Sequence, residues 1–364
     1  MDVAGRVARL RDGFADAEID ALLVTRLTNV RYLTGFTGSA GMLLVLPDGA
    51  VFVTDGRYAE QSGEQLGGAG VDARIEIGTT AARQREALQA AVKGAGVTRL
   101  GLEADGVTWA QQRDFAADWF PGIELVPTTS LVEDLRIVKE DGEVARIRAA
   151  CAIADEALAE LLPRLTERPT EREFALDLEF AMRRRGATAV SFDPIVASGP
   201  NGAKPHARPS DRRIEPGELV VIDFGCIVDG YCSDMTRTVS VGDPGAEARR
   251  VWDTVRVSQQ AGRDAVAVGV ACADVDRASR AVIEDAGWGD AFVHGTGHGV
   301  GLDIHEAPRV ASTAGGTLAL GHVVTVEPGV YLPGVGGVRI EDTLVVTPSG
   351  PVALTEFPKE LIVS

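Results

Sequence analysis

The sequence predicts an α+β protein of two domains, in which an N-terminal α/β domain with a mixed sheet precedes a domain made of two related halves. A length of 364 residues is enough for two separate cores. Helix and strand signals alternate over residues 1–125. Beyond residue 141, a pair of helices followed by a hairpin occurs twice. The limits that we predict are 1–128 for the first domain, 129–140 for a linker and 141–364 for the second domain.

Short apolar segments and amphipathic segments alternate in the first domain. A Pro-Asp-Gly turn at 47–49 separates two of the apolar segments, as in a hairpin. Neither a Walker loop nor a dinucleotide fingerprint occurs here. We expect strands at 21–25, 42–46, 51–54 and 99–103, and helices at 83–92 and 109–119.

Two apolar segments of the second domain share one pattern at a constant offset. Residues 217–225 and residues 321–329 each contain a glycine, an apolar strand, one acidic residue and a second glycine. The acidic residues are Asp223 and Glu327, and their offset of 104 (327 − 223) equals that of the glycines. The two segments therefore indicate an internal duplication.

Each of these strands is followed by a turn that brings a second carboxylate beside the first. A hairpin about Asp229-Gly230 places Asp223 and Asp234 diagonally on one face. A hairpin centred on Gly334 places Glu327 opposite Glu341 (327 + 341 = 2 × 334). Neighbouring carboxylates at the ends of apolar strands repel each other and lose hydration, and a bound cation relieves both penalties. These four acids are therefore predicted metal ligands.

Helical periodicity precedes each hairpin. The apolar residues of 144–162 recur at helical spacing, and prolines at 163 and 169 interrupt the pattern. We expect helices at 144–162, 171–185, 246–268 and 272–286, and an extended segment at 191–199.

Composition and charge exclude several classes of partner. The net charge is −17, whereas nucleic acid and anionic membranes need basic patches. No apolar segment approaches a membrane span in length, and no signal peptide is visible at the N-terminus. The four cysteines form no CxxC pair, so we expect no structural disulfide and a cytoplasmic location.

Four of the five histidines occur in polar or glycine-rich segments, where sites are more common than cores. The segment His294–Gly301 fails the spacing of nucleotide-binding loops, and we interpret its glycines as allowing backbone to approach a metal. His305-Glu306 begins like the zincin HExxH motif, but Arg309 occupies the position of the second histidine. His322 begins a strand of the duplicated unit, and we expect it to be structural.

The four negative charges of the carboxylates balance the charge of two divalent ions rather than one, and one imidazole adds a nitrogen ligand. Such a ligand set suits Mn²⁺, Co²⁺ or Zn²⁺. A water between two ions could ionise near neutral pH and act as a hydroxide nucleophile, so the reaction class is metal-assisted hydrolysis. Spacing alone leaves open whether an amide or a phosphate is cleaved, and the acidic balance favours a substrate that carries an amine.

The motifs resemble those of the pita-bread metallopeptidases, and within them the Xaa-Pro branch of aminopeptidase P and prolidase. The resemblance covers nearly the whole chain. Segment 29–38 is similar to the creatinase-type N-terminal domain of that family. The other segments that carry the resemblance are 198–206, 223–238, 294–299, 305–308, 326–331 and 338–342.

The resemblance implies a role for each site residue. Asp223 would bind one metal, Asp234 and Glu341 would bridge both, and His298 and Glu327 would complete the ligands of the other metal. The remaining residues would act on the substrate or support the site: His206, His305 and Arg339 in catalysis, and His294 and Tyr331 in substrate binding.

The implied function is a dinuclear metal-dependent exopeptidase that hydrolyses the Xaa-Pro bond at the N-terminus of peptides, as aminopeptidase P does. Its implied substrates are short peptides with proline at the second position. The implied cofactors are two divalent ions, Mn²⁺ before Co²⁺ or Zn²⁺, and the implied assembly is a homodimer. An Xaa-Pro dipeptidase (prolidase) is the alternative, and a non-enzymatic peptide-binding module on the same fold is more remote. The N-terminal domain disfavours methionine aminopeptidase, and the intact ligands disfavour creatinase.

Overall fold

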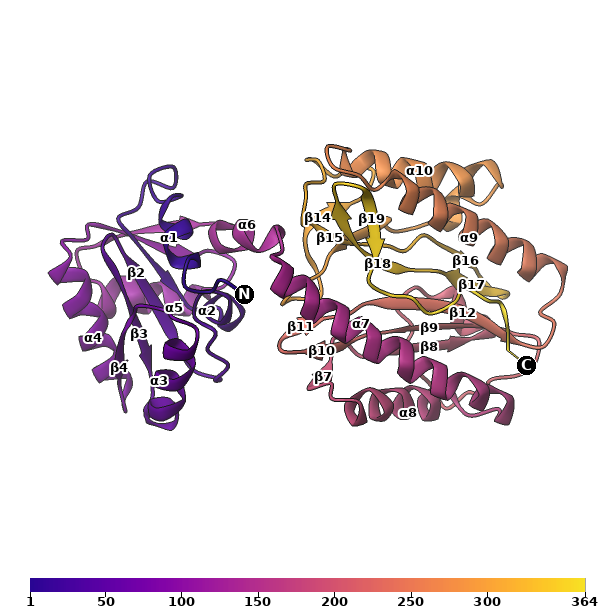
Figure 1. Cartoon of the computed structure of the whole chain (residues 1–364), viewed down its shortest axis with the longest axis horizontal. Coiled ribbons are helices and arrows are strands. Elements are labelled where there is room, and N and C mark those ends of the chain that lie inside the picture. The colour runs from indigo at the N-terminus through magenta and orange to yellow at the C-terminus, as the bar shows by residue number, and fades with distance from the viewer. Residues whose placement is uncertain (364) are drawn as a thin grey trace. The chain divides into compact units, whose positions relative to one another are not determined.

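The computed structural model describes residues 1–363, which form two compact units, Met1–Arg136 and the chain from Ile137 onward. Each unit has its own sheets and its own core, so each is described by itself (Figure 1). The limits predicted for the domains, 1–128 and 141–364, stay predictions. Most of the predicted linker, 129–140, is helical, because α6 spans Leu131–Ile137.

The first unit is built on one mixed sheet of six strands in the order β4-β3-β2-β1-β5-β6. The strand β1 pairs antiparallel with β2 and parallel with β5, which makes the sheet mixed as predicted. The strands are β1 Ala21–Val24, β2 Met42–Leu46, β3 Gly49–Thr54, β4 Arg74–Ile77, β5 Arg99–Glu103 and β6 Glu124–Thr128.

The helices of this unit bury one apolar face against the sheet. Leu88 and Val92 of α4 are buried in a cluster with Leu23 and Leu100 of the strands. The four predicted strands and two predicted helices are present, although the second helix changes to a π-helical turn at 115–119. The α-helices are α1 Arg6–Arg11, α2 Leu27–Thr34, α3 Ala59–Gly68, α4 Ala81–Gly94 and α5 Trp109–Asp114.

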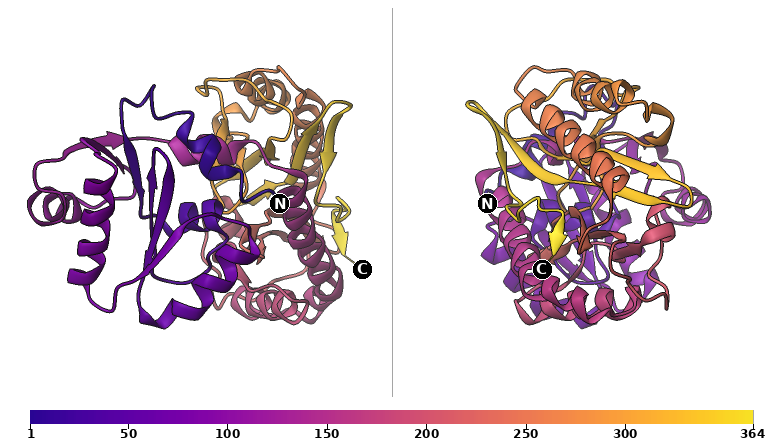
Figure 2. Two further views of the ribbon diagram at one scale, coloured as in Figure 1. Left: turned by 60° about the vertical axis from the view of Figure 1, so that its left-hand side comes forward. Right: turned by 90° about the vertical axis from the view of Figure 1, so that its right-hand side faces the viewer.

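The second unit contains four long helices on the two sides of its strands. Figures 1 and 2 show α7 and α8 on one side and α9 and α10 on the other. These are the four helices that periodicity predicts. Their bounds are α7 Asp141–Leu161, α8 Glu171–Arg184, α9 Ala246–Ala265 and α10 Cys272–Asp285.

The strands of this unit form a four-stranded sheet (β20-β12-β9-β8), a five-stranded sheet (β14-β13-β15-β18-β19), a three-stranded sheet (β11-β10-β7) and the hairpin β16-β17. The bounds are β7 Ala189–Val190, β8 Ile195–Ser198, β9 Leu219–Phe224, β10 Cys226–Val228, β11 Tyr231–Cys232, β12 Met235–Val241, β13 Gly297–Gly299, β14 Glu306–Val310, β15 Val323–Val326, β16 Gly329–Leu332, β17 Gly336–Arg339, β18 Asp342–Thr347, β19 Gly350–Ala353 and β20 Ile362–Val363.

Strand register places the predicted carboxylates as the sequence indicates. In the first hairpin, Thr236 of β12 faces Asp223 of β9, so Asp234 lies diagonally across from Asp223. In the second, Val326 faces Asp342 and Gly329 faces Arg339. Both pairs are centred on position 334, which puts Glu327 and Glu341 at opposed positions between them.

The cores of the two halves also correspond. One cluster joins α7 and α8 to β9 and β12, through residues such as Leu158, Leu178 and Ile222. Two others join α9 and α10 to strands of the second half, through residues such as Val255 and Val326. The predicted duplication of helix pair and hairpin is therefore the plan of this unit.

The four cysteines are buried and free, in agreement with the expectation of no disulfide. Among the described residues, no helix is both long enough and apolar enough to cross a bilayer.

Candidate metal centre

One cavity of about 630 Å³ in the second unit brings the predicted site residues together. It is lined by all five predicted metal ligands and by four of the five other predicted site residues. Tyr331 is not part of the lining, but its hydroxyl contacts two residues that are. The nine predicted residues that are part of the lining are His206, Asp223, Asp234, His294, His298, His305, Glu327, Arg339 and Glu341.

The ligands of each half lie where buried strands meet the cavity. Asp223 is near the end of β9, and Asp234 immediately precedes β12. Glu327 follows β15, and Glu341 precedes β18. The apolar strands fix the backbone on the core side, so these carboxylates are held in place by packing rather than by the solvent-exposed part of a loop.

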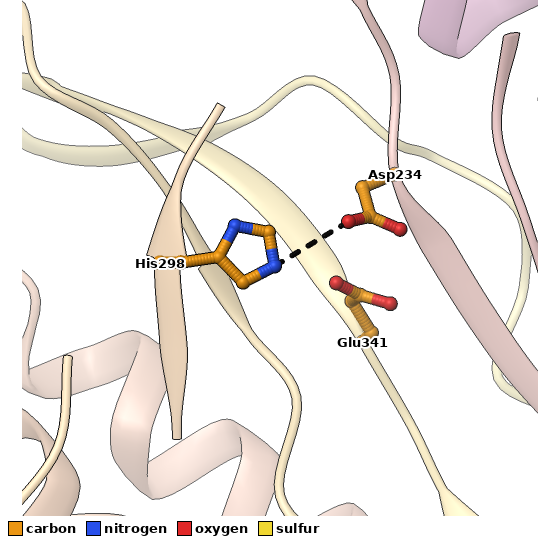
Figure 3. Close-up of side chains that lie close together, drawn as sticks. All are labelled: Asp234, His298 and Glu341. Atoms are coloured by element: carbon orange, nitrogen blue, oxygen red, sulfur yellow. Dashed lines mark ion pairs between the residues drawn. The ribbon is translucent and has the colours of Figure 1, made fainter. Parts of the chain in front are cut away.

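Three ligand atoms from Asp234, His298 and Glu341 lie within 4.8 Å of one another, as metal ligands do (Figure 3). His298 is the middle residue of β13, and its Nε2 is 3.5 Å from Oδ2 of Asp234. The same Nε2 is 3.3 Å from Oε1 of Glu327. The imidazole therefore faces one carboxylate from each hairpin.

Burial and mutual repulsion make three of the carboxylates hard to ionise without a cation. Burial raises the pKa of Asp234 well above its usual value, and the charges of Glu341 and Asp223 raise it further. Burial, with the charges of Glu327 and Asp223, likewise raises the pKa of Glu341 well above the usual range. Burial also raises the pKa of Asp223, although Arg339 opposes this shift. A divalent ion among these groups would favour the ionised forms.

Glu327 and His298 behave as an ion pair. Burial opposes ionisation of Glu327, but the hydrogen bond from His298 overcomes it and lowers the pKa of Glu327 to about 2. Burial disfavours the charged imidazole, and the same hydrogen bond with Glu327 outweighs burial and raises the pKa of His298. The charged forms of the two side chains therefore stabilise each other, and a divalent ion bound here would compete with the proton on His298.

Two buried oxygens test whether the residues fit a metal. Oδ1 of Asp223 and Oε1 of Glu341 are inaccessible to solvent and have no hydrogen-bond partner among the described residues. Their other oxygens are hydrogen-bonded, to Arg339 and Thr236 respectively. A buried carboxylate oxygen without a partner costs free energy unless it binds a cation. The donor set of four carboxylates and one imidazole thus fits divalent metal ions.

Arg339 connects the two hairpins behind the carboxylates. Its Nη2 donates to Oδ2 of Asp223 at 2.6 Å, and its Nη1 donates to the Tyr331 hydroxyl at 2.6 Å. Nη1 also donates to the carbonyl of Pro205, which precedes His206, at 3.2 Å. Its Nε contacts Oγ1 of Thr236 at 3.2 Å. The guanidinium therefore orients a ligand, a tyrosine and the backbone of the His206 segment at once.

The three other cavity histidines differ in their surroundings. Nε2 of His294 is 2.8 Å from the Tyr331 hydroxyl, and burial lowers the pKa of His294. The His305 ring stands edge-on to the His298 ring at 4.4 Å, and burial with the nearby His298 lowers the pKa of His305. His206 is exposed at the cavity wall. Burial therefore favours the neutral ring of His294 and of His305, and His206 lies where it can hydrogen-bond to a ligand in the cavity.

The glycines on either side of His298 allow close packing of strands. A Cβ on Gly297 would lie 2.0 Å from the carbonyl oxygen of Thr325, and one on Gly299 would lie 2.2 Å from that of Ala307. These residues let β13 approach the neighbouring strands β15 and β14 closely. The crowding at these two glycines is between backbones, and the interpretation that they let backbone approach a metal stays a prediction.

Two arginines of the cavity wall were not predicted to be part of the site. Arg208 and Arg309 are exposed, and neither forms a hydrogen bond or ion pair with the residues that the structure describes. Arg309 was considered only as the residue that excludes a zincin motif. The signal that was available is its position four residues after His305, on β14.

His322 lies outside the cavity lining, as expected of a structural residue. Its Nδ1 accepts the backbone N–H of Ala319 at 3.2 Å, and burial lowers its pKa.

Comparison with protein families agrees with this geometry. The model of metallopeptidase family M24 matches residues 145–348, and that of the creatinase/prolidase N-terminal domain matches residues 6–138. The chain belongs to metallopeptidase family M24. The predicted resemblance, the two-domain fold class and the assignment to the metallo-exopeptidases are thereby confirmed.

Similar M24 sequences extend over the whole chain. An uncharacterized peptidase of Bacillus subtilis is 41% identical over 98% of this chain and 99% of its own length. The Xaa-Pro dipeptidase of Pyrococcus horikoshii is 34% identical over 100% of both chains. The similarity thus includes both units.

Solved structures of M24 proteins are also similar throughout. The Xaa-Pro dipeptidase from Bacillus anthracis has a TM-score of 0.93 and 40% identity, covering 99% of this chain and 100% of that one. The X-Pro aminopeptidase from Thermotoga maritima has a TM-score of 0.88 and 33% identity, covering 95% and 98%. Because structures of both a dipeptidase and an aminopeptidase are similar, the comparisons do not distinguish between these two activities.

Proposed function

We propose that this M24 protein is a dinuclear metal-dependent exopeptidase that hydrolyses the bond between the first residue and a following proline. The observation that carries the proposal is the convergence of four carboxylates and His298 on one cavity. Two divalent ions would balance the four negative charges. Mn²⁺ is the first candidate, because the ligands are mostly oxygens with a single imidazole nitrogen.

The five ligands would hold the ions as the resemblance implies, with Asp234 and Glu341 shared between them. When bound, such ions supply an activated water and polarise the scissile carbonyl. The chain itself supplies the rest. His206 and His305 stand on the cavity wall, where they can donate hydrogen bonds to the carbonyl oxygen or to the departing proline nitrogen. Arg339 holds Asp223 and Tyr331, and Tyr331 in turn fixes the ring of His294.

The dipeptidase form of this activity has a specific observation in its favour. A dipeptide carries a free carboxylate directly after the proline, close to the scissile bond. Arg208 and Arg309 supply two guanidinium groups to a cavity that is otherwise rich in carboxylates. Since neither has a partner among residues 1–363, both are available to a substrate carboxylate. Aminopeptidase P-like cleavage of longer peptides is the second candidate.

The experiment is a comparison of three substrates with the metal-loaded protein. An Xaa-Pro dipeptide, the same dipeptide as its C-terminal amide, and an Xaa-Pro-Yaa tripeptide differ in the group that follows proline. Hydrolysis of any of them that a chelator abolishes and Mn²⁺ restores supports the metallo-exopeptidase. Preference for the free dipeptide supports the dipeptidase, and equal or better cleavage of the tripeptide supports the aminopeptidase. Failure to cleave all three would contradict the proposal.

Assembly as a homodimer is proposed on the basis of the family resemblance, and a cytoplasmic location on the basis of the cysteine pattern. The mass of the purified protein in solution tests the first, and cell fractionation tests the second.

A further inference from the structure

Glu171 is a carboxylate that lies outside the cavity lining and is completely buried. It is the first residue of α8, and its two oxygens accept hydrogen bonds from three residues of one segment. Oε1 accepts from the backbone N–H of Ser198 at 2.7 Å and from its hydroxyl at 2.9 Å. Oε2 accepts from the backbone N–H of Ser210 at 3.0 Å and from its hydroxyl at 2.6 Å. The amide of Asn201 donates to both oxygens, at 3.2 and 3.1 Å.

These donors bracket the segment that carries His206. Ser198 ends β8 and Ser210 lies four residues after His206, so the carboxylate ties together both ends of the segment. The backbone repeats the connection, because the N–H groups of Glu171 and Arg172 donate to the carbonyls of Arg212 and Ser210. A buried carboxylate with this many donors is costly to remove, since each donor would lose its partner.

The other side of the segment contacts β17, which carries Arg339. Nη1 of Arg339 donates to the carbonyl of Pro205. A Cβ on Gly337 would lie 2.1 Å from the carbonyl oxygen of Gly202, so β17 and the segment are in close backbone contact. The segment therefore has Glu171 on one side and the metal site on the other.

We propose that Glu171 is a positioning residue, which sets the place of His206 in the cavity by fixing both ends of the segment 198–210. Glu171 does not line the cavity, and none of its hydrogen-bond partners is a predicted metal ligand. Its effect on the site therefore passes through the segment 198–210. Only the kinetic test of this inference rests on the proposed hydrolysis. The conformational order of residues 198–210 can be measured without a substrate.

Glu171→Gln is the informative variant. Each oxygen of Glu171 faces a backbone N–H, so the –NH₂ group of glutamine must oppose one of these donors in either orientation. The matched control is Leu178→Ala, which removes a fully buried side chain from the same helix two turns later. It destabilises the packing of α8 without removing a hydrogen bond to the segment.

Hydrogen–deuterium exchange gives the first readout, and it needs no substrate. We expect Glu171→Gln to speed exchange of amides in 198–210 by at least roughly tenfold relative to α10, and Leu178→Ala not to do so. Unchanged exchange of this segment in Glu171→Gln would overturn the proposal, whatever bond the enzyme cleaves. A selective increase in a protein that fails to cleave Xaa-Pro peptides would instead support the positioning and reject only the proposed function.

Kinetics give the second readout. We expect Glu171→Gln to lower kcat on the order of 10- to 100-fold, with bound metal unchanged, because displacement of a reacting group by about 1 Å has an effect of that size. In a His206→Ala background, the same change should lower kcat by less than about threefold, since the group it positions is gone. An equal loss in both backgrounds, or a loss no larger than that in Leu178→Ala, would overturn the proposal.

Discussion

Nη2 of Arg339 lies 2.6 Å from Oδ2 of Asp223, and both side chains are buried at the junction of the two hairpins. The contact crosses 116 residues of sequence. The other oxygen of Asp223 has no hydrogen-bond partner among residues 1–363, and that oxygen is the one available to a metal. The arginine thus restricts how its neighbour can act as a ligand.

Replacement of Arg339 by lysine should lower kcat/KM on the order of 100-fold. One ammonium group cannot reach Asp223, Tyr331 and the Pro205 carbonyl together, and a lost charged hydrogen bond costs about 1.5–3 kcal/mol. Steady-state kinetics of the Mn²⁺-loaded variant measure the effect. Tyr331→Phe is the companion variant. It keeps the guanidinium and removes one hydroxyl, so its loss should be smaller; an equal or larger loss would contradict this account.

Asp234→Ala should abolish activity and reduce bound metal while the protein stays folded. The side chain would be shared by both proposed ions, and it is a buried carboxylate whose pKa burial raises. Metal analysis, circular dichroism and kinetics test the three parts. Asp229→Asn is the matched control, because it removes an acidic group from the exposed turn of the same hairpin and asparagine tolerates the positive φ of 47° found there. Near-normal turnover of Asp234→Ala would show that the site is assigned wrongly.

His206→Ala and His298→Ala should separate catalysis from metal binding. His206 is exposed on the cavity wall, whereas His298 faces the carboxylates at 3.3 and 3.5 Å. We expect the first variant to lose turnover by a factor on the order of 100 with metal content unchanged, as general acid–base or oxyanion groups do. The second should lose metal and turnover together. Parallel loss of both properties in His206→Ala would make His206 a ligand instead.

Arg309→Ala should weaken binding of the free dipeptide more than that of its amide. Loss of one charge-assisted hydrogen bond to the substrate carboxylate corresponds to roughly a tenfold rise in KM, or about 1.4 kcal/mol. The amide has no such charge, so its KM should change little. Arg256→Ala, an exposed arginine that is not part of the cavity wall, serves as the control. Equal effects on dipeptide and amide would argue against carboxylate recognition.

Gly299→Ala should destabilise the protein and reduce metal binding together. A Cβ there would lie 2.2 Å from the carbonyl oxygen of Ala307, so β13 must move away from β14 and carry His298 with it. Thermal unfolding and metal analysis measure the two effects. The control is Gly315→Ala, where a Cβ has no heavy atom within 4 Å. A Gly299→Ala protein with unchanged stability and full metal content would refute the close-packing role of this residue.

The arrangement of the carboxylates could be predicted because register follows from local signals. An apolar strand, a turn with glycine and a returning strand fix which residues face each other, and both hairpins have the predicted centres. The fact that the four carboxylates and His298 share one cavity required the duplication and the resemblance in addition, since no local pattern reports on contacts more than 100 residues apart.

Elements at the edges of the first unit could not be predicted. Strand β4 is an edge strand whose residues are only half-buried or exposed, so it lacks a clear apolar pattern. Strand β6 contains Pro127, which indicates a loop unless it is known that the strand lies at the other edge. Helix α3 has three glycines among its ten residues, which is a poor helix composition.

The supports of the site were also missed. Glu171 follows Thr170, the N-cap of α8, and its sequence context is that of an ordinary first-turn acid. Only the three-dimensional structure shows that Ser198, Asn201 and Ser210 converge on it. Side-chain networks of this kind depend on tertiary placement and carry no periodic signal.

The hydrogen bonds that join the hairpins have one more implication. Thr236 donates to Glu341 and Thr343 donates to the carbonyl of Asp234, so each half of the second unit helps to aim ligands of the other. A chain in which only one half had folded would offer a divalent ion two loosely held carboxylates and little else. Tight metal binding would therefore occur late in folding, only after both halves of the second unit have come together.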